Sequence, residues 1–75
     1  MRFIELSGKT LRRVVTDGEL THADLAKLGI GDETIVRVNP QGDIEVRRKD
    51  RWDVIGGLLG NFEHRIQRET GLDWA

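Results

Sequence analysis

The chain has 75 residues, of which 33% are charged, with a formal net charge of −1 and no cysteine. Its length predicts one small domain over residues 1–75 with a marginal core, and the lack of cysteine excludes disulfides and cysteine-based zinc sites. The near-neutral charge argues against nucleic-acid binding through bulk electrostatics. Residues 1–10 lack the apolar run of a signal peptide, and no stretch of ~18 apolar residues would span a membrane, so we expect a soluble, cytoplasmic protein.

The N-terminal segment alternates apolar and polar residues, which is typical of strands at residues 2–6 and 11–15. Between them, Gly8 and Lys9 suit a two-residue type II′ turn, in which glycine takes the position that needs a positive φ. The sequence therefore predicts an N-terminal β-hairpin.

A short helix is expected at about residues 22–28. Thr21 suits the N-cap, and Asp24 three residues later places a carboxylate beside the free amides of the first turn. Gly29 is a natural residue to end the helix.

A second hairpin is predicted at residues 34–38 and 44–48, on either side of the Asn-Pro-Gln-Gly-Asp loop. The register that pairs the apolar residues on one face also places Arg37 opposite Glu45 on the other. The apolar pairs expected on the buried face are Val36 with Val46 and Val38 with Ile44.

After residue 50 the apolar spacing becomes helical, which predicts a long amphipathic helix at residues 51–69. The glycines at 56, 57 and 60 each cost a helix roughly 1 kcal/mol relative to alanine. We expect one helix with a kink at Gly60; a break there, with Asn61 capping a second helix, is the alternative.

These elements define an α+β fold in the order ββαββα, in which two hairpins form one antiparallel sheet covered by the C-terminal helix. The residues expected in the core are Ile4, Leu6, Leu11, Leu25, Leu28, Val36, Val38, Ile44, Val46, Ile55, Leu59, Phe62 and Ile66.

No motif for catalysis or cofactor binding stands out. His22 and His64 have no partner at ligand spacing, which is typical of solvated surface histidines, and the chain has no glycine-rich phosphate loop. Caps and turns account for the carboxylates. We therefore expect no enzyme activity, no cofactor and no metal.

The last helix carries more apolar residues than a small sheet needs to cover, which favours a homodimer or contact with another protein. Gly56 and Gly60 are spaced for close backbone approach, either to the chain's own sheet or to a second helix. Trp74 is expected to dock on the chain's own core or on a partner. The candidate interface residues are Trp52, Ile55, Gly56, Leu59, Gly60, Phe62, Ile66 and Trp74. The leading hypothesis is a small non-enzymatic protein-interaction or oligomerisation module.

The second hypothesis is a nucleic-acid-binding regulator. Basic residues crowd between 47 and 51, either as a solvated strand end or as a phosphate-contacting patch. The candidate contacts are Arg12, Arg13, Arg37, Arg47, Arg48, Lys49 and Arg51.

The stretch from Leu28 to Val46, with its LGI helix end, its Gly31-Asp32 turn and the hairpin after it, resembles the swapped-hairpin transition regulators of the AbrB and MazE kind. This resemblance implies two interlaced chains that reach DNA through Arg12, Arg13 and Arg37.

Residues 1–52 also look like the β-grasp sulfur carriers of thiamine and molybdopterin synthesis. The shared features are the first hairpin, the helix with Asp24-Leu25, and Val36-x-Val38-Asn39 leading to Arg48 and Trp52. Those carriers end in a free Gly-Gly, whereas Gly56-Gly57 is internal here, so we expect no carrier role.

Overall fold

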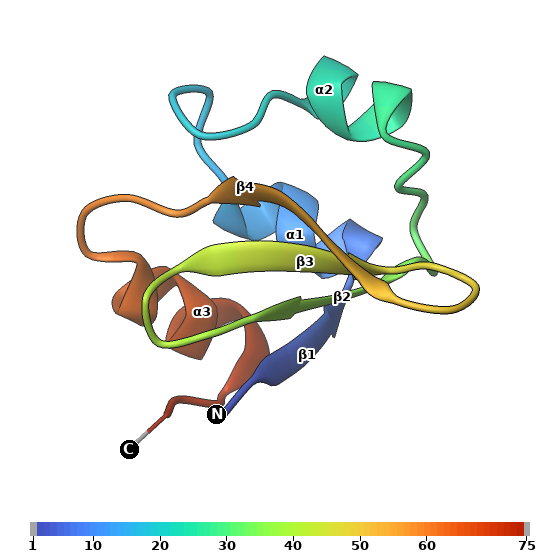
Figure 1. The fold of residues 1–75 in the computed structure, drawn as a ribbon. Coiled ribbons are helices and arrows are strands. Elements are labelled where there is room, and N and C mark those ends of the chain that lie inside the picture. Colours follow the sequence, from blue (N-terminus) through green and yellow to red (C-terminus); the bar gives the residue numbers. More distant parts are fainter. Residues whose placement is uncertain (1, 75) are drawn as a thin grey trace.

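The computed structural model describes residues 2–74 and has an α+β architecture (Figure 1). Its elements are β1 (Ile4–Ser7), α1 (Gly8–Val14), α2 (His22–Lys27), β2 (Ile35–Val38), β3 (Asp43–Arg47), β4 (Trp52–Gly57) and α3 (Phe62–Thr70). The four strands form one antiparallel sheet in the order β1-β2-β3-β4. The α+β class and the antiparallel sheet are as predicted, but the order of the elements is not.

The β2–β3 hairpin has the register that the alternating apolar residues predict. Val36 pairs with Val46, and Val38 pairs with Ile44, with all four side chains buried on the inner face. Arg37 pairs with Glu45 on the outer face, because successive side chains of a strand point to opposite sides.

The predicted N-terminal hairpin is wrong, because residues 8–14 form helix α1. The Ser7 hydroxyl accepts a hydrogen bond from the Thr10 amide and caps this helix. Leu11 and Val14, three residues apart, point into the core together. Strand β1 therefore pairs with β2 and not with the segment that follows it.

The predicted long C-terminal helix is also wrong. Its first part is strand β4, which pairs with β3 through a register shift at Ile44 and Glu45. Gly60 has a φ of +63°, a conformation that favours glycine and ends any regular element there. Helix α3 starts directly after Asn61, as in the alternative of a break at Gly60, although the Asn61 side chain makes no capping hydrogen bond.

Helix α2 begins and ends close to the predicted residues. Thr21 and Asp24 form a reciprocal capping box, and Gly29 follows the helix with a φ of +75°. Helices α1 and α3 contact each other, and their buried side chains join the inner face of the sheet in one apolar cluster.

Most of the predicted core is buried, with three exceptions. Leu28 and Ile55 are only partly buried, and Leu59 is 65% exposed because it lies in the β4–α3 loop and not on a helix. The core also contains four residues outside the predicted set, Val14, Leu20, Ile30 and Leu58, and it includes Trp74.

Candidate functional site

An arginine held between two aromatic rings occupies the middle of the outer sheet face. The guanidinium carbon of Arg37 lies 3.7 Å from the ring centroid of Phe3 and 4.1 Å from that of Trp52. Arg37 Nε donates a hydrogen bond of 2.7 Å to Glu45 Oε1. We call these four residues, Phe3, Arg37, Glu45 and Trp52, the arginine clamp. All four strands or their flanks supply it, so its geometry depends on the assembled sheet.

The charged side chains of the clamp are largely shielded from solvent and are stabilised by their contacts with each other and with the rings. The side chains of Arg37 and Glu45 are only 22% and 14% exposed, although they lie on the face opposite the core. Cation–π contacts of this kind stabilise by roughly 0.5–1 kcal/mol each where the cation stays partly solvated. Phe3 and Trp52 remain partly exposed, and each keeps apolar surface at the solvent boundary.

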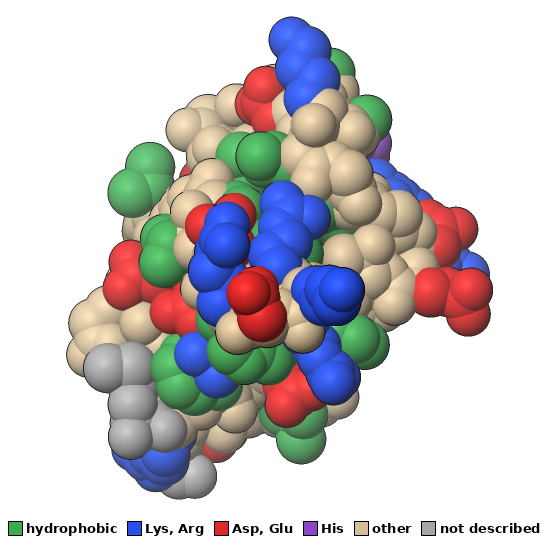
Figure 2. All heavy atoms as spheres, turned by 45° about the vertical axis from the view of Figure 1, so that its right-hand side comes forward, with side chains coloured by type: hydrophobic (Ala, Val, Ile, Leu, Met, Phe, Trp, Pro, Cys, Tyr) green, Lys and Arg blue, Asp and Glu red, His purple; other side chains and the backbone are tan. Residues whose placement is uncertain are grey.

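Next to the clamp, the end of β3 and the turn before β4 carry four of the seven basic residues that were predicted to contact nucleic acid. We call residues 47–51 the basic loop. Figure 2 shows Lys and Arg side chains gathered on the side of the molecule that carries this loop, with acidic side chains among and beside them. Arg47, Lys49 and Arg51 are exposed, and Trp52 follows directly in the chain. The basic loop and the clamp therefore form one continuous surface.

The basic side chains of the basic loop differ in the ion pairs and hydrogen bonds that they form within the chain. Arg48 is anchored, because its Nη2 donates to the Leu28 carbonyl at 3.1 Å and its Nε lies 3.7 Å from Asp53. Arg51 approaches Asp50 only at 4.0 Å, with both side chains largely exposed. Within residues 2–74, neither Arg47 nor Lys49 forms an ion pair.

The two other predicted nucleic-acid contacts lie elsewhere. Arg12 and Arg13 are on helix α1, on the core side of the sheet. Arg12 pairs with Asp32, and Arg13 Nε lies 2.8 Å from Glu69 on α3. The structure therefore groups five of the seven predicted basic residues and leaves these two in intramolecular ion pairs.

The predicted interface residues do not form one helical stripe. Three of them, Phe62, Ile66 and Trp74, are buried in the core of their own chain. A Cβ on Gly56 would lie 3.2 Å from Leu20, so its close approach is to the chain's own core. The others lie apart: Trp52 in the clamp, Ile55 partly buried on β4, and Leu59 and Gly60 exposed in a loop.

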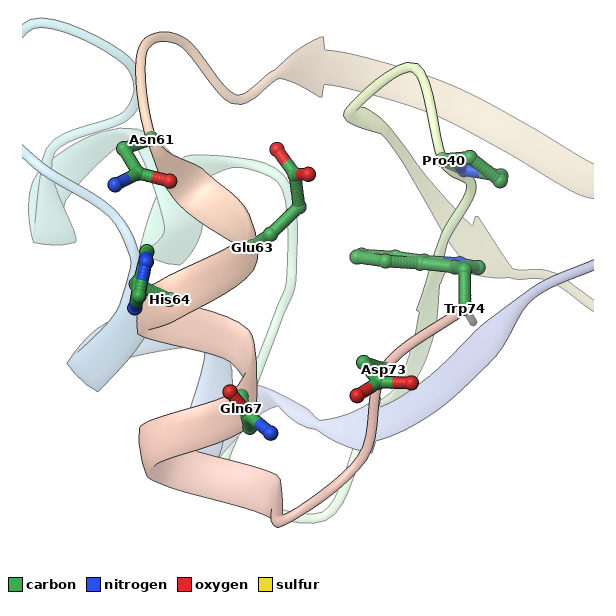
Figure 3. A pocket seen from close by; sticks show the side chains of 7 residues that line it. All are labelled: Pro40, Asn61, Glu63, His64, Gln67, Asp73 and Trp74. Carbon is green, nitrogen blue, oxygen red and sulfur yellow. The ribbon is translucent and has the colours of Figure 1, made fainter.

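Trp74 docks on its own chain, the first of the two expected alternatives. Its indole Nε1 donates to the Val38 carbonyl at 3.2 Å, and its ring meets Phe62 edge-on with centroids 6.0 Å apart. A shallow pocket of about 320 Å³ lies beside it, lined by Pro40, Asn61, Glu63, His64, Gln67, Asp73 and Trp74. The Trp74 ring lies between Pro40 and Asp73, and His64 is at the far end of the pocket (Figure 3).

Among the described residues, the groups with clearly shifted pKa values lie away from both places. These groups are Glu19, Asp24, Arg65 and Glu69, each in an ion pair or helix cap. Among residues 2–74, no three His, Asp or Glu side chains are grouped to hold a metal ion.

The chain was compared with protein-family models, with curated proteins and with solved structures, and none of the three comparisons gave a match. In the described part of the chain, no helix has the length and apolar character needed to cross a membrane.

The sequence pointed to the basic loop but missed the clamp. Arg37 and Glu45 were expected to pair across the hairpin, as they do. The two aromatic residues were not linked to them, because Trp52 was expected on the long helix and Phe3 was not among the predicted core or site residues. A strand assignment for residues 52–57 would have placed Trp52 on the outer face beside Arg37.

Proposed function

We propose that this protein is a small non-enzymatic binding module that binds nucleic acid through the basic loop and the outer face of its sheet. The observation that carries the proposal is the pair of exposed, unpaired cations, Arg47 and Lys49, on a surface shared with Trp52. The burial of Phe62, Ile66 and Trp74 removes the apolar helix stripe on which self-association was predicted, so nucleic acid is favoured over a second protein.

The overall net charge of −1 means that attraction must be local. The basic loop supplies Arg47, Lys49 and Arg51 to solvent against one exposed acid, Asp50. Neutralising about three phosphates would give a moderate affinity that falls roughly 20- to 40-fold between ~50 and ~200 mM salt, through release of counterions.

The test measures the fluorescence polarisation of fluorescein-labelled oligonucleotides of about 12 nucleotides as the protein is added. Single strand and duplex are each titrated at ~50 and ~200 mM salt. The combined variant Arg47→Ala, Lys49→Ala and Arg51→Ala should lose most of the binding and flatten the salt dependence. The control is Arg68→Ala, which removes an exposed arginine from α3, far from the basic loop. If neither the single strand nor the duplex binds at the lower salt concentration, the proposal is overturned.

A second candidate is self-association through the outer face. It is favoured by Val54, which is 63% exposed on edge strand β4 beside the clamp. In this case two copies would cover each other's Val54 and Trp52. Sedimentation velocity should then show a dimer that Val54→Lys dissociates, whereas a clean monomer at high micromolar concentration rejects this candidate.

A further inference from the structure

We infer that the bound nucleic acid is single-stranded and that one of its bases stacks on the arginine clamp at Trp52. This inference rests on the proposed function and specifies its ligand. The exposed side chains Arg47, Lys49 and Arg51 beside the clamp are positive, which suits a polyanion, and the clamp itself presents the partly exposed rings of Phe3 and Trp52.

The rings of the clamp are placed to stack with a base. The guanidinium of Arg37 lies 4.1 Å above the Trp52 ring and 3.7 Å from Phe3, so ring, cation and ring form a short stack on the sheet. Trp52 is partly exposed, and a planar base stacked on its exposed surface would extend this arrangement. Aromatic residues on open antiparallel sheets bind unstacked bases in this way.

Contacts within the chain hold the clamp together. Glu45 fixes the Arg37 guanidinium by a 2.7 Å hydrogen bond, and Arg37 in turn fixes the position of the Trp52 ring. A preordered ring loses little rotamer freedom on binding, so more of the stacking energy contributes to affinity. The negative charge of Glu45 is neutralised by Arg37 and does not repel phosphate.

Cations of the basic loop lie close to the Trp52 ring. Arg51 is adjacent to Trp52 in sequence, and Arg47 is its cross-strand partner on β3. The phosphates next to a stacked base would therefore lie close to positive charge. In a duplex the bases are stacked on each other, so their faces are closed to Trp52.

The test compares the intact protein with the variants Trp52→Leu and Trp52→Phe by fluorescence polarisation. Each is titrated into a labelled single strand of about 12 nucleotides and into the matched duplex at ~50 mM salt. Trp52→Leu should weaken single-strand binding roughly 5- to 100-fold, because one stacked base is lost, and should change duplex binding little. Trp52→Phe keeps an aromatic face and should retain most of the affinity. The intact protein should also prefer the single strand.

A spectroscopic readout separates stacking from a loss of folding. Tryptophan fluorescence of the intact protein should be quenched by the unlabelled single strand. In Trp52→Phe only Trp74 remains, buried near Val38, so the quenching should disappear although binding persists. Circular dichroism and thermal unfolding of Trp52→Leu check that the sheet is intact, and Trp52→Phe carries the test if that variant unfolds.

The outcomes distinguish this inference from the proposed function. Base stacking is overturned if the protein binds single strand and duplex equally, if tryptophan fluorescence is not quenched and if Trp52→Leu has no effect on binding. Phosphate binding by the basic loop would still stand. Binding of neither oligonucleotide overturns both.

Discussion

Arg65 and Glu19 form a two-point ion pair that joins helix α3 to the loop after α1. Arg65 Nη1 lies 2.9 Å from Glu19 Oε1 and Nη2 lies 2.7 Å from Oε2, with the Glu19 side chain only 2% exposed. Arg65 also donates to the carbonyls of Val14 and Leu59, and the Leu59 amide donates to Glu19. The ion pair therefore holds the β4–α3 loop, which contains Leu59, in place. This loop interrupts the segment that was predicted to be one continuous helix.

The first prediction concerns acid stability. The hydrogen bond from Arg65 lowers the pKa of Glu19 to about 2, against the opposing effect of burial. A depressed pKa stabilises the fold above the unfolded value of 4.5, and this stability is lost as pH falls toward 2. We expect the free energy of unfolding to fall by about 3 kcal/mol between pH 6 and pH 2 from this group.

Urea unfolding at a series of pH values measures this effect. Glu19→Gln should be less stable near neutral pH and should show a smaller loss on acidification. Some loss remains, because hydrogen bonds also lower the pKa values of Asp24 and Glu69. The control Glu63→Gln, at an exposed position of α3, should keep the full acid sensitivity. An unchanged pH profile in Glu19→Gln would contradict the assignment.

The second prediction concerns the close approach between Gly8, the first residue of helix α1, and the backbone at Gly31. A Cβ on Gly8 would lie 2.0 Å from the Gly31 carbonyl oxygen, while the Gly8 amide is held by the Thr34 carbonyl at 2.8 Å. Gly8→Ala should therefore destabilise the protein by about 1–3 kcal/mol, because the backbone must move to relieve the clash. Thermal unfolding checks this, with Gly18→Ala as the control, since nothing lies within 4 Å of that position. Equal stability of the two variants would count against the close approach of α1.

The third prediction concerns the docked tryptophan. Trp74→Ala should cost about 3 kcal/mol, because it removes a buried ring from Phe62 and leaves the Val38 carbonyl without its indole donor. Leu72→Ala, at a side chain that is 51% exposed, should change stability by less than about 0.5 kcal/mol. Denaturant unfolding of both variants gives the comparison. A similar small effect for both would mean that the tail contributes little to the core.

The fourth prediction concerns the capping box of α2. The Thr21 hydroxyl accepts from the Asp24 amide at 3.0 Å, and the Thr21 amide donates to the Asp24 carboxylate at 3.0 Å. Thr21→Ala should cost about 1 kcal/mol, and Thr21→Ser should restore most of it. Thr16→Ala is a matched control at an exposed threonine outside any helix. Equal losses from both alanine variants would show that the cap is not the cause.

The sequence predicted elements best where local and long-range preferences agree. In the hairpin of β2 and β3, the apolar alternation and the opposite charges of Arg37 and Glu45 select the same register. In α2, Thr21, Asp24 and Gly29 mark both ends of the helix. Each of these signals lies within a few residues of the element that it defines.

The errors arose where an apolar pattern fits two periods. Leu11 and Val14 suit a helix, but Leu11 to Val15 also reads as a short strand, and only the pairing of β1 with the distant β2 decides between them. Trp52, Ile55 and Leu59 are spaced as on a helix, yet Gly56 and Gly57 disfavour one and β3 offers an edge to pair with. The clamp depends on these long-range pairings, so local patterns could not predict it.

The order of the strands has a consequence for how the chain reaches its native state. Strands β2, β3 and β4 are joined by short turns, so their contacts close quickly, whereas β1 joins β2 only after residues 8–34 have looped back. Nucleation should therefore begin in the three-stranded meander, with the amino-terminal strand added last. Phe3 arrives with that strand, so the second ring reaches Arg37 only at the closing step of folding.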